Sequence, residues 1–390
     1  MTKPTFVSER AWGIPPSGIR KFFDIAATMQ DVISLGIGEP DFDTPEPIVQ
    51  AGIVALQNGA THYTSNSGLL ELREALAAHI ADRYAVRYDP LQEVLVTVGV
   101  SEALYIAMAA VLDAGDEIII ADPCFVAYAP TAKMVNAVPV MVPTTPETEF
   151  QLTAEAIETA ITPRTKAILL ASPNNPTGAV TRREQLTQIA DVAARHNLIV
   201  IADEIYDRLV YGTEHICFAS LPGMRHRTIV LQGFSKSYAM TGWRVGYLAG
   251  PTELVWEIRK LHQYLIMSAP TASQWAALKA LEVGDPYVED MRAEYDRRRR
   301  LIVGGLNDLG MACTEPQGAF YAFPCVGQTG LDDNIFAEML LQEEHVAVVP
   351  GRAFGAAGAG FVRMSYATAY EKIEVALERI ARFVQRHRGF

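Results

Sequence analysis

The chain has 390 residues, of which 49% are hydrophobic and 20% charged, and it carries a formal net charge of −12. This length exceeds the roughly 250–300 residues at which a single hydrophobic core usually stops growing, so we expect two domains. The excess of acidic residues argues against nucleic acid or an anionic membrane surface as the main partner.

The N-terminal stretch and the cysteines indicate a cytoplasmic protein. The first twenty residues contain no apolar run of the kind found in secretory signals, and no later run reaches the roughly 18–20 residues that a membrane span needs. No Cys-x-x-Cys pair and no metal-binding histidine spacing occur, so we expect no metal site. We expect reduced, buried thiols at the four scattered cysteines, Cys124, Cys217, Cys313 and Cys325.

Short apolar runs alternate with amphipathic stretches from about Glu93 to Ala249. The stretches between the runs, such as "SEALYIAMAAVL" and "TRREQLTQIADVAARHN", have helical spacing. This alternation predicts an α/β fold in three layers, a mostly parallel sheet with helices on both faces. The carboxyl ends of parallel strands share one edge, where a ligand is expected. The predicted strands are "EVLVTVGV", "DEIIIAD", "TKAILLASP", "LIVIADEIY", "RTIVLQGFS" and "VGYLAGP".

The pattern changes after Pro286 to a smaller α+β unit. A long helix is predicted up to Gly310, strands in "GAFYAFP", "VAVVPG" and "FVRMSYA", and an amphipathic helix at the C-terminus. The run Arg297 to Arg300 is interpreted as a solvated helix face balanced by Glu294 and Asp296. We predict an N-terminal arm and joining segment over 1–45, a large domain over 46–285 and a small domain over 286–390.

The stretch "GFSKSYAMTGWR" places Lys236 at the end of a predicted strand, among small residues. A partly desolvated lysine loses its proton more easily and can form a Schiff base with a carbonyl. Ser235 and Arg244 flank it and can bind a phosphate or carboxylate. A second anion site is expected in "TVGVSEAL", where a strand ends at Gly99 and a helix begins at about Ser101 with free backbone N–H groups.

Three further polar residues lie at predicted strand ends. Asp203 closes the apolar run "LIVIAD", where a carboxylate is costly unless a cation meets it. Tyr206 follows three residues later, and Asn175 in "SPNNPTG" offers a donor and an acceptor, although this stretch alone also reads as a simple turn. A ligand with an aldehyde, a phosphate, a ring nitrogen and a phenolate oxygen would use all of these groups. Pyridoxal 5′-phosphate is such a ligand.

The chain resembles the class I, fold-type I aminotransferases that depend on pyridoxal 5′-phosphate. The likeness runs from about Ile19 to the C-terminal helix, and "GFSKSYAMTGWRVG" matches the family's lysine-attachment signature throughout. Other family motifs follow in the expected order: "LGIGEPDFDTP", "HYTSNSG", "SPNNPTGAV", "ADEIY", "QGAFY", "VAVVPG" and "VRMSYA".

The resemblance implies a role around the cofactor for each matching position. Lys236 would hold the aldehyde covalently and later move the substrate's Cα proton. Asp203 would pair with the ring nitrogen, Tyr206 and Asn175 would hydrogen-bond the phenolate oxygen, and Phe125 would stack on the ring.

The resemblance also assigns the cofactor phosphate and the substrate carboxylate. Ser235 and Arg244 would hold the phosphate together with the backbone at Val100, Ser101 and Glu102. Tyr63 would reach the phosphate of a neighbouring subunit, which implies a homodimer. Arg363 would bind the substrate α-carboxylate, helped by the backbone at Gly38 and by Asn175.

The implied reaction is a ping-pong transfer of an amino group from an L-amino acid to a 2-oxo acid such as 2-oxoglutarate. Ser101 stands where some relatives with acidic substrates have a lysine, and "YLIMSAPTAS" lacks the arginine of others. This favours aromatic or broad-range donors, with aspartate as the alternative. Arg20 would contact an acidic co-substrate or form a surface ion pair. A carbon–sulfur lyase of the same fold remains open, whereas a DNA-binding regulator would need a further N-terminal module before about Ile19.

Overall fold

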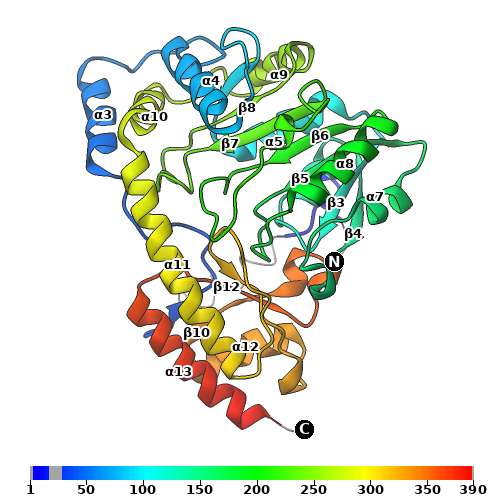
Figure 1. Cartoon of the computed structure of the whole chain (residues 1–390), viewed down its shortest axis with the longest axis vertical. Coiled ribbons are helices and arrows are strands. Elements are labelled where there is room, and N and C mark those ends of the chain that lie inside the picture. Colours follow the sequence, from blue (N-terminus) through cyan, green and yellow to red (C-terminus); the bar gives the residue numbers. More distant parts are fainter. Residues whose placement is uncertain (1–2, 17–28, 389–390) are drawn as a thin grey trace.

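The computed structural model describes residues 3–16 and 29–388, and its centre is a seven-stranded sheet (Figure 1). The strand order is β2-β8-β7-β6-β5-β3-β4. Strand β8 runs antiparallel to both of its neighbours, and the other pairs are parallel, which confirms the mostly parallel sheet. The strands are β2 (Val94–Thr97), β3 (Glu117–Asp122), β4 (Val138–Pro143), β5 (Thr165–Ala171), β6 (Ile199–Asp203), β7 (Thr228–Gly233) and β8 (Gly246–Ala249).

Helices cover both faces of this sheet because its strands are apolar on both sides. In β3, Ile118 and Ile120 pack into one buried cluster and Ile119 into another on the opposite face. The first face carries α5 (Gly99–Val111), α6 (Tyr128–Met134) and α9 (Thr252–Leu265). The helices packed elsewhere on the sheet are α7 (Ala154–Ala160), α8 (Arg183–Arg195), α3 (Glu46–Gln57), α4 (Leu70–Tyr84) and α10 (Thr271–Val283).

Edge strand β4 was missed in the sequence because "VPVMVP" contains two prolines. Proline cannot donate to a sheet ladder, and it is tolerated at a sheet edge, where one side of the strand needs no partner. The start of α5 also differs from the expectation, since β2 ends at Thr97 and the helix begins at Gly99, not at about Ser101.

The C-terminal part is a smaller α+β unit, as expected (Figure 1). It contains a three-stranded sheet in the order β11-β12-β9, and a parallel pair that joins β1, from the N-terminal segment, to β10. The domain limits at 45 and 285 stay predictions. The elements are β1 (Ile33–Ser34), β9 (Tyr321–Ala322), β10 (Val346–Ala347), β11 (Val349–Pro350), β12 (Val362–Ser365), α11 (Asp285–Asp308), α12 (Asp333–Glu344) and α13 (Tyr370–His387).

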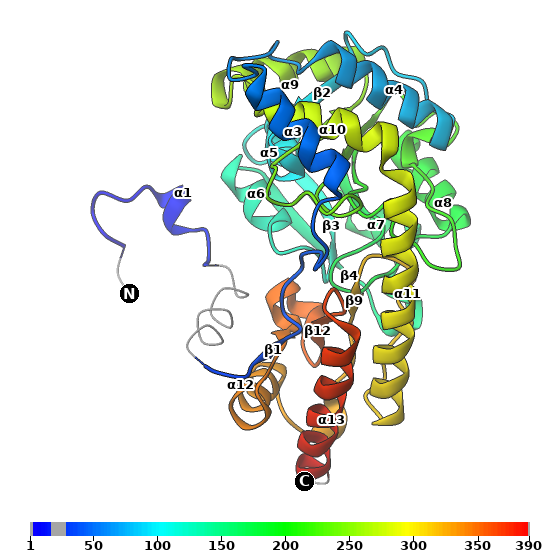
Figure 2. The same ribbon diagram turned by 90° about the vertical axis from the view of Figure 1, so that its left-hand side faces the viewer.

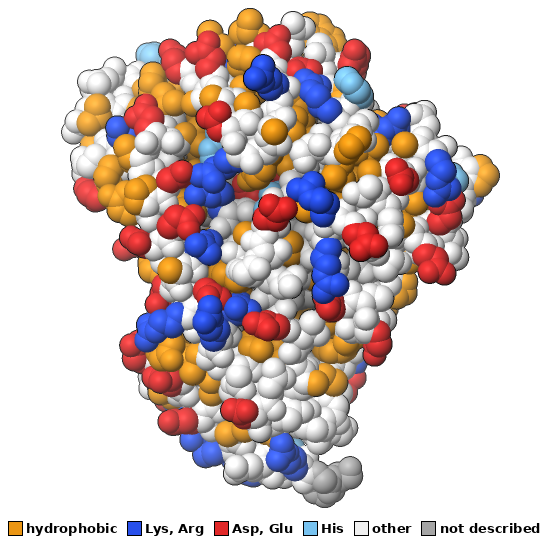
Figure 3. Space-filling view, in the orientation of Figure 1, with side chains coloured by type: hydrophobic (Ala, Val, Ile, Leu, Met, Phe, Trp, Pro, Cys, Tyr) orange, Lys and Arg blue, Asp and Glu red, His pale blue; other side chains and the backbone are white. Residues whose placement is uncertain are grey.

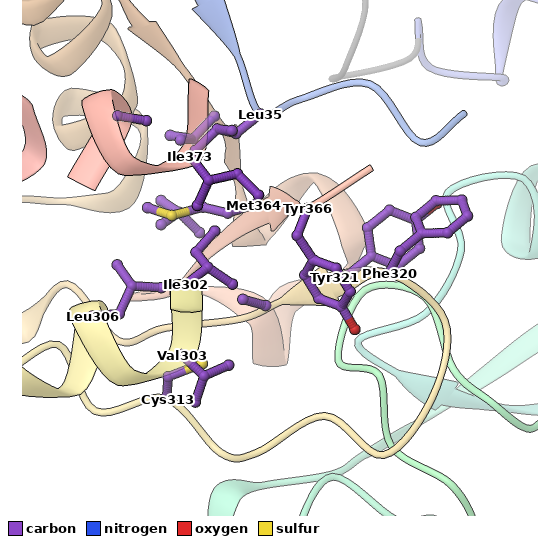
Figure 4. Close-up of a cluster of buried hydrophobic side chains, with 14 of the residues drawn as sticks. Leu35, Ile302, Val303, Leu306, Cys313, Phe320, Tyr321, Met364, Tyr366 and Ile373 are labelled. Atoms are coloured by element: carbon purple, nitrogen blue, oxygen red, sulfur yellow. The ribbon is translucent and has the colours of Figure 1, made fainter. Parts of the chain in front are cut away.

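The largest core of this part is an apolar cluster to which segments far apart in the sequence contribute (Figure 4). Leu35 enters it from the N-terminal segment, Ile302 from α11, Met364 from β12 and Ile373 from α13, and all four are fully buried. Tyr321 on β9 packs into the same cluster. The short strand that carries Tyr321 is therefore held by side chains from four other elements.

The interpretation of Arg297 to Arg300 as a solvated face was wrong for two of the four residues. Arg298 and Arg299 are only 6% and 7% exposed. Arg298 pairs with Glu294 and with Asp41 from the N-terminal segment, and Arg299 pairs with Asp296 and Glu315. The carboxylates within the helix were anticipated, whereas those brought by other segments were not.

The surface gives few further clues to function. Positive and negative side chains are interspersed over the face in Figure 3. The short helix α1 (Glu9–Trp12) lies beside α6 at one side of the molecule (Figure 2).

Among the helices of the described ranges, none combines the length and the apolar character that a membrane crossing requires. The cytoplasmic location stays a prediction.

Candidate active site

A cavity of about 410 Å³ lies at the carboxyl edge of the central sheet, where the C-terminal part meets it. Its volume falls in the range of small-molecule sites, roughly 300–1,000 Å³. The cavity brings together all but three of the residues singled out in the sequence. Those that line it are Gly38, Val100, Ser101, Phe125, Asn175, Asp203, Tyr206, Ser235, Lys236, Arg244 and Arg363.

Lys236 follows β7 and projects its amine into this cavity. Its Nζ donates a hydrogen bond to the Gly38 carbonyl oxygen at 2.7 Å. Burial lowers the pKa of the amine from 10.5 to about 8, and Arg363 and Arg244 add to this lowering against the opposing carboxylate of Glu39. The amine therefore loses its proton far more easily than a solvated lysine, as a nucleophile or general base requires.

Asp203 ends β6 at the buried end of the site. Its Oδ2 accepts a hydrogen bond from the Tyr128 hydroxyl at 2.8 Å, and its Oδ1 accepts one from the Ile205 backbone N–H at 3.2 Å. Burial raises the pKa of this carboxyl group to about 6, although the Tyr128 hydrogen bond works against the rise. Tyr128 was missed in the sequence; it stands three residues after Phe125, at the start of α6, and that spacing was the available signal.

Arg363 on β12 is 2% exposed and is held from several sides. Its Nη1 donates to Asn175 Oδ1 at 3.0 Å, and its Nη2 donates to the Gly36 carbonyl oxygen at 2.6 Å. The rings of Tyr321 and Phe354 lie 4.5 and 4.8 Å from the guanidinium carbon. No carboxylate of the described ranges forms an ion pair with Arg363, and burial lowers the pKa of its guanidinium. The cavity thus contains a buried cation whose hydrogen-bond partners within residues 3–16 and 29–388 are neutral.

Tyr206 also lines the cavity, and its hydroxyl is 2.8 Å from that of Tyr321. Tyr321 also lines the cavity and is 1% exposed. Tyr321 is the tyrosine of the family motif "QGAFY", and no role was predicted for it from the sequence. The position of that tyrosine next to Arg363 depends on the pairing of β9 with β12, which no local pattern reveals.

The N-terminus of α5 and Arg244 form the anion-binding end of the cavity. Gly99 has a φ of +71°, and a Cβ there would lie 2.7 Å from an Arg244 guanidinium nitrogen. A Cβ on Gly246 would lie 3.0 Å from the Val100 backbone nitrogen. Both positions thus leave no room for a larger side chain, and the close approach brings the guanidinium to the helix N-terminus, where backbone N–H groups favour an anion.

Three predicted residues do not line the cavity. The Glu102 side chain bonds His262 Nδ1 at 2.6 Å and accepts the Val98 N–H at 2.5 Å, so it braces the start of α5 from outside. Tyr63 is 81% exposed. Arg20 lies outside the described residues.

The chain matches the family described as aminotransferase class I and II over residues 30–380. It is 47% identical to an aspartate aminotransferase of Pyrococcus abyssi and 45% identical to aromatic-amino-acid aminotransferase 2 of Thermococcus litoralis, with 97% of this chain and 98% of each relative covered. The solved aspartate aminotransferase of Thermus thermophilus with maleate superposes with a TM-score of 0.93 at 40% identity, covering 97% of this chain and 100% of that one. The likeness thus extends along nearly the whole chain, and the protein belongs to aminotransferase class I and II.

Proposed function

We propose that this aminotransferase binds pyridoxal 5′-phosphate in the 410 Å³ cavity and transfers the amino group of an L-amino acid to a 2-oxo acid. The observation that carries the proposal is one cavity lined by a lysine of lowered pKa and by a buried guanidinium without a carboxylate partner among the described residues. An amino acid has the matching carboxylate, and the lysine can bind a carbonyl.

The donor set fits the cofactor at each of its polar groups. Lys236 is the amine for the aldehyde, and Asp203 is the carboxylate for the ring nitrogen. Tyr206 and Asn175 would hydrogen-bond the phenolate oxygen, and Phe125 would stack on the ring.

The phosphate has its own set of donors at the other end of the cavity. Ser235, Arg244 and the backbone N–H groups of Val100 and Ser101 would hold it. The glycine at 99, where a Cβ would meet Arg244, keeps this end open to an anion.

Proton transfer would be carried by the chain's own lysine. When bound, the cofactor supplies an electron-withdrawing ring that takes up the electron pair left at the substrate Cα. Lys236 would remove the Cα proton and deliver it to the C4′ carbon of the cofactor, a role typically worth 10²–10⁴-fold in rate. Asp203 would stay ionised above a pH of about 6 and hold the ring nitrogen protonated.

We propose an aromatic or broad-range amino donor and 2-oxoglutarate as the acceptor, with aspartate as the alternative donor. Ser101 brings no positive charge to the cavity, and Ile37, Leu104 and Tyr321 add apolar surface to its lining. Both an aspartate and an aromatic aminotransferase stand among the relatives. A panel of amino donors with 2-oxoglutarate, compared by kcat/KM, decides between these donors, and release of ammonia and pyruvate from cystathionine would instead support a lyase.

We further propose that two copies assemble, with Tyr63 reaching the phosphate end of the neighbouring cavity. Tyr63 is 81% exposed, and the nearby Thr271 hydroxyl bonds the His62 carbonyl oxygen at 2.6 Å. Several further apolar side chains at the end of α9 and on the connection that follows it are exposed, namely Tyr264, Leu265, Ile266 and Met267. Light scattering should report a dimer, and a monomer with full activity would contradict this proposal.

The direct test of the cofactor and of the lysine is the variant Lys236→Ala. Purified wild-type protein should show the visible absorbance of a lysine-bound cofactor that borohydride reduces, and the band should shift on addition of tyrosine or phenylalanine. Lys236→Ala should lose both the reducible band and turnover. A fully active Lys236→Ala protein would disprove the proposal.

A further inference from the structure

Tyr321 contacts three groups of the cavity at once. Its ring lies 4.5 Å from the Arg363 guanidinium carbon, and its hydroxyl lies 2.8 Å from the Tyr206 hydroxyl. The same hydroxyl oxygen lies 2.5 Å from where a Cβ on Gly38 would be, beside the carbonyl that accepts from Lys236. One side chain thus touches the arginine proposed to bind the substrate, the tyrosine proposed to bind the cofactor, and the loop whose carbonyl oxygen accepts from Lys236.

The strand pairing fixes the ring of Tyr321 beside Arg363. Tyr321 pairs with Ser365 across the antiparallel β9–β12 ladder, so Arg363, two residues before Ser365, is its diagonal neighbour on the same face. Phe320 packs edge-on against the ring with centroids 4.9 Å apart, and Tyr206 does so at 5.9 Å. Figure 4 shows Tyr321 within the apolar cluster of the C-terminal part.

The ring is one of two that enclose the guanidinium. Phe354 lies 4.8 Å from it, and the Nε of Arg363 is buried without a hydrogen-bond partner among the described residues. Two neutral oxygens and two aromatic faces therefore determine where the Nη atoms point. A cation over a desolvated aromatic face is stabilised, and its orientation is restricted.

The proposed role of Tyr206 determines which hydroxyl is the donor in the hydrogen bond between Tyr206 and Tyr321. Burial raises the pKa of both tyrosines, so both hydroxyls keep their protons and one donates to the other. If Tyr206 donates its proton to the anionic cofactor oxygen, Tyr321 must be the donor in the tyrosine pair. A hydroxyl that accepts one hydrogen bond donates a stronger one.

We propose that Tyr321 is a positioning residue with two separable roles. Its ring fixes the Arg363 guanidinium for the substrate carboxylate, and its hydroxyl donates to Tyr206 and strengthens the bond of Tyr206 to the cofactor oxygen. This inference rests on the proposed function, because both roles act on the cofactor-loaded site.

Three variants of the full-length protein separate the roles. Tyr321→Phe keeps the ring and removes the hydroxyl, and Tyr321→Leu removes both. Tyr366→Phe is the matched control, because Tyr366 is fully buried nearby and its hydroxyl bonds the Ala319 carbonyl oxygen at 3.3 Å. Each variant is loaded with pyridoxal 5′-phosphate, and the absorbance of the cofactor is followed as the pH is varied. The Kd of 3-phenylpropanoate, a carboxylate without an amino group, is also measured.

Tyr321→Phe should raise the pH midpoint of the absorbance change by about half a unit, since a weaker hydrogen bond stabilises the negative cofactor oxygen less. Its Kd for 3-phenylpropanoate should stay within about twofold of wild type, whereas Tyr321→Leu should raise that Kd and the KM for the amino acid roughly tenfold. Tyr366→Phe should change neither quantity.

If the pH midpoint of the absorbance change is the same in Tyr321→Phe and Tyr366→Phe, the proposed role of the Tyr321 hydroxyl is overturned. Equal Kd values for Tyr321→Leu and Tyr321→Phe would overturn the ring role. In both cases a wild type that binds the cofactor and turns over leaves the proposed function intact. A wild type without a cofactor band would overturn the proposed function and this inference with it.

Discussion

Two regions of this protein bury arginine side chains to nearly the same depth, but under opposite electrostatic conditions. On α11, Arg298 and Arg299 are 6% and 7% exposed, and in the cavity Arg363 is 2% exposed. Burial alone would lower the pKa of all three, yet Asp41 and Glu294 raise that of Arg298, and Asp296 and Glu315 do the same for Arg299. The pKa of Arg363 stays lowered.

The difference separates buried charges that the fold compensates from one that it leaves uncompensated, as the proposed role of Arg363 requires. The arginines of α11 meet carboxylates from their own helix and from distant segments, so their charges are compensated in the folded chain. Arg363 meets two neutral oxygens and two rings, which leaves its charge to be compensated by an incoming anion. A buried cation without a counter-ion lowers stability and favours binding of a carboxylate.

The largest expected effect separates the two regions directly. Arg363→Leu should lower kcat/KM for the amino acid about 10³-fold, because two charge-assisted hydrogen bonds to the carboxylate are lost. The free energy of unfolding of the ligand-free protein should stay within about 1 kcal/mol of wild type, since an uncompensated charge leaves with the side chain. Steady-state kinetics and urea unfolding measure both. A strongly destabilised Arg363→Leu protein would contradict the distinction.

The second prediction concerns Lys236, another buried residue of the cavity whose pKa is lowered. The pKa of Lys236 is about 8 in the folded protein against 10.5 for an ordinary lysine, so the folded state binds fewer protons between these values and stability rises with pH across that window. Below pH 8 the buried charge costs up to about 3 kcal/mol. Ligand-free Lys236→Met should therefore be more stable than wild type at pH 7, and the difference should shrink towards pH 10. A pH-independent difference in urea unfolding would rule this out.

The third prediction tests a paired arginine. Arg299→Leu should lower the free energy of unfolding by about 2 kcal/mol, because Asp296 and Glu315 lose their buried partner. The kcat/KM of the folded fraction should stay within about twofold of wild type, opposite to the result at Arg363. Loss of activity without loss of stability would place Arg299 in the functional group.

The smallest effect concerns Asp203. Removing the Tyr128 hydroxyl takes away a hydrogen bond that lowers the carboxyl pKa, so Tyr128→Phe should raise that pKa from about 6 by about one unit. Carbon-13 NMR of ligand-free protein labelled at aspartate can follow the titration, with Asp203→Asn to assign the signal. An unchanged titration midpoint in Tyr128→Phe would mean that burial alone sets the pKa of the Asp203 carboxyl group.

The sequence was sufficient for the central sheet except its edge strand β4, and for most of the cavity, and the reason is physical. Strand-end residues such as Asn175, Asp203 and Lys236 lie together because parallel strands share one carboxyl edge. Contacts between distant segments could not be predicted in this way. Asp41 meets Arg298 across 257 positions, and Tyr321 reaches Arg363 only through the small sheet. The proposed roles of the site residues and the domain limits stay predictions.

The segment at 36–38 holds two cationic side chains of the cavity, Lys236 and Arg363, through its backbone. The Gly36 carbonyl oxygen accepts from Arg363 and the Gly38 carbonyl oxygen accepts from Lys236. A molecule that forms a hydrogen bond with the Lys236 amine must first displace the Gly38 carbonyl oxygen. Its binding therefore replaces one hydrogen bond of the amine with another. The measured affinity is then a difference between two sets of hydrogen bonds, and changes in the backbone at 36–38 should alter it.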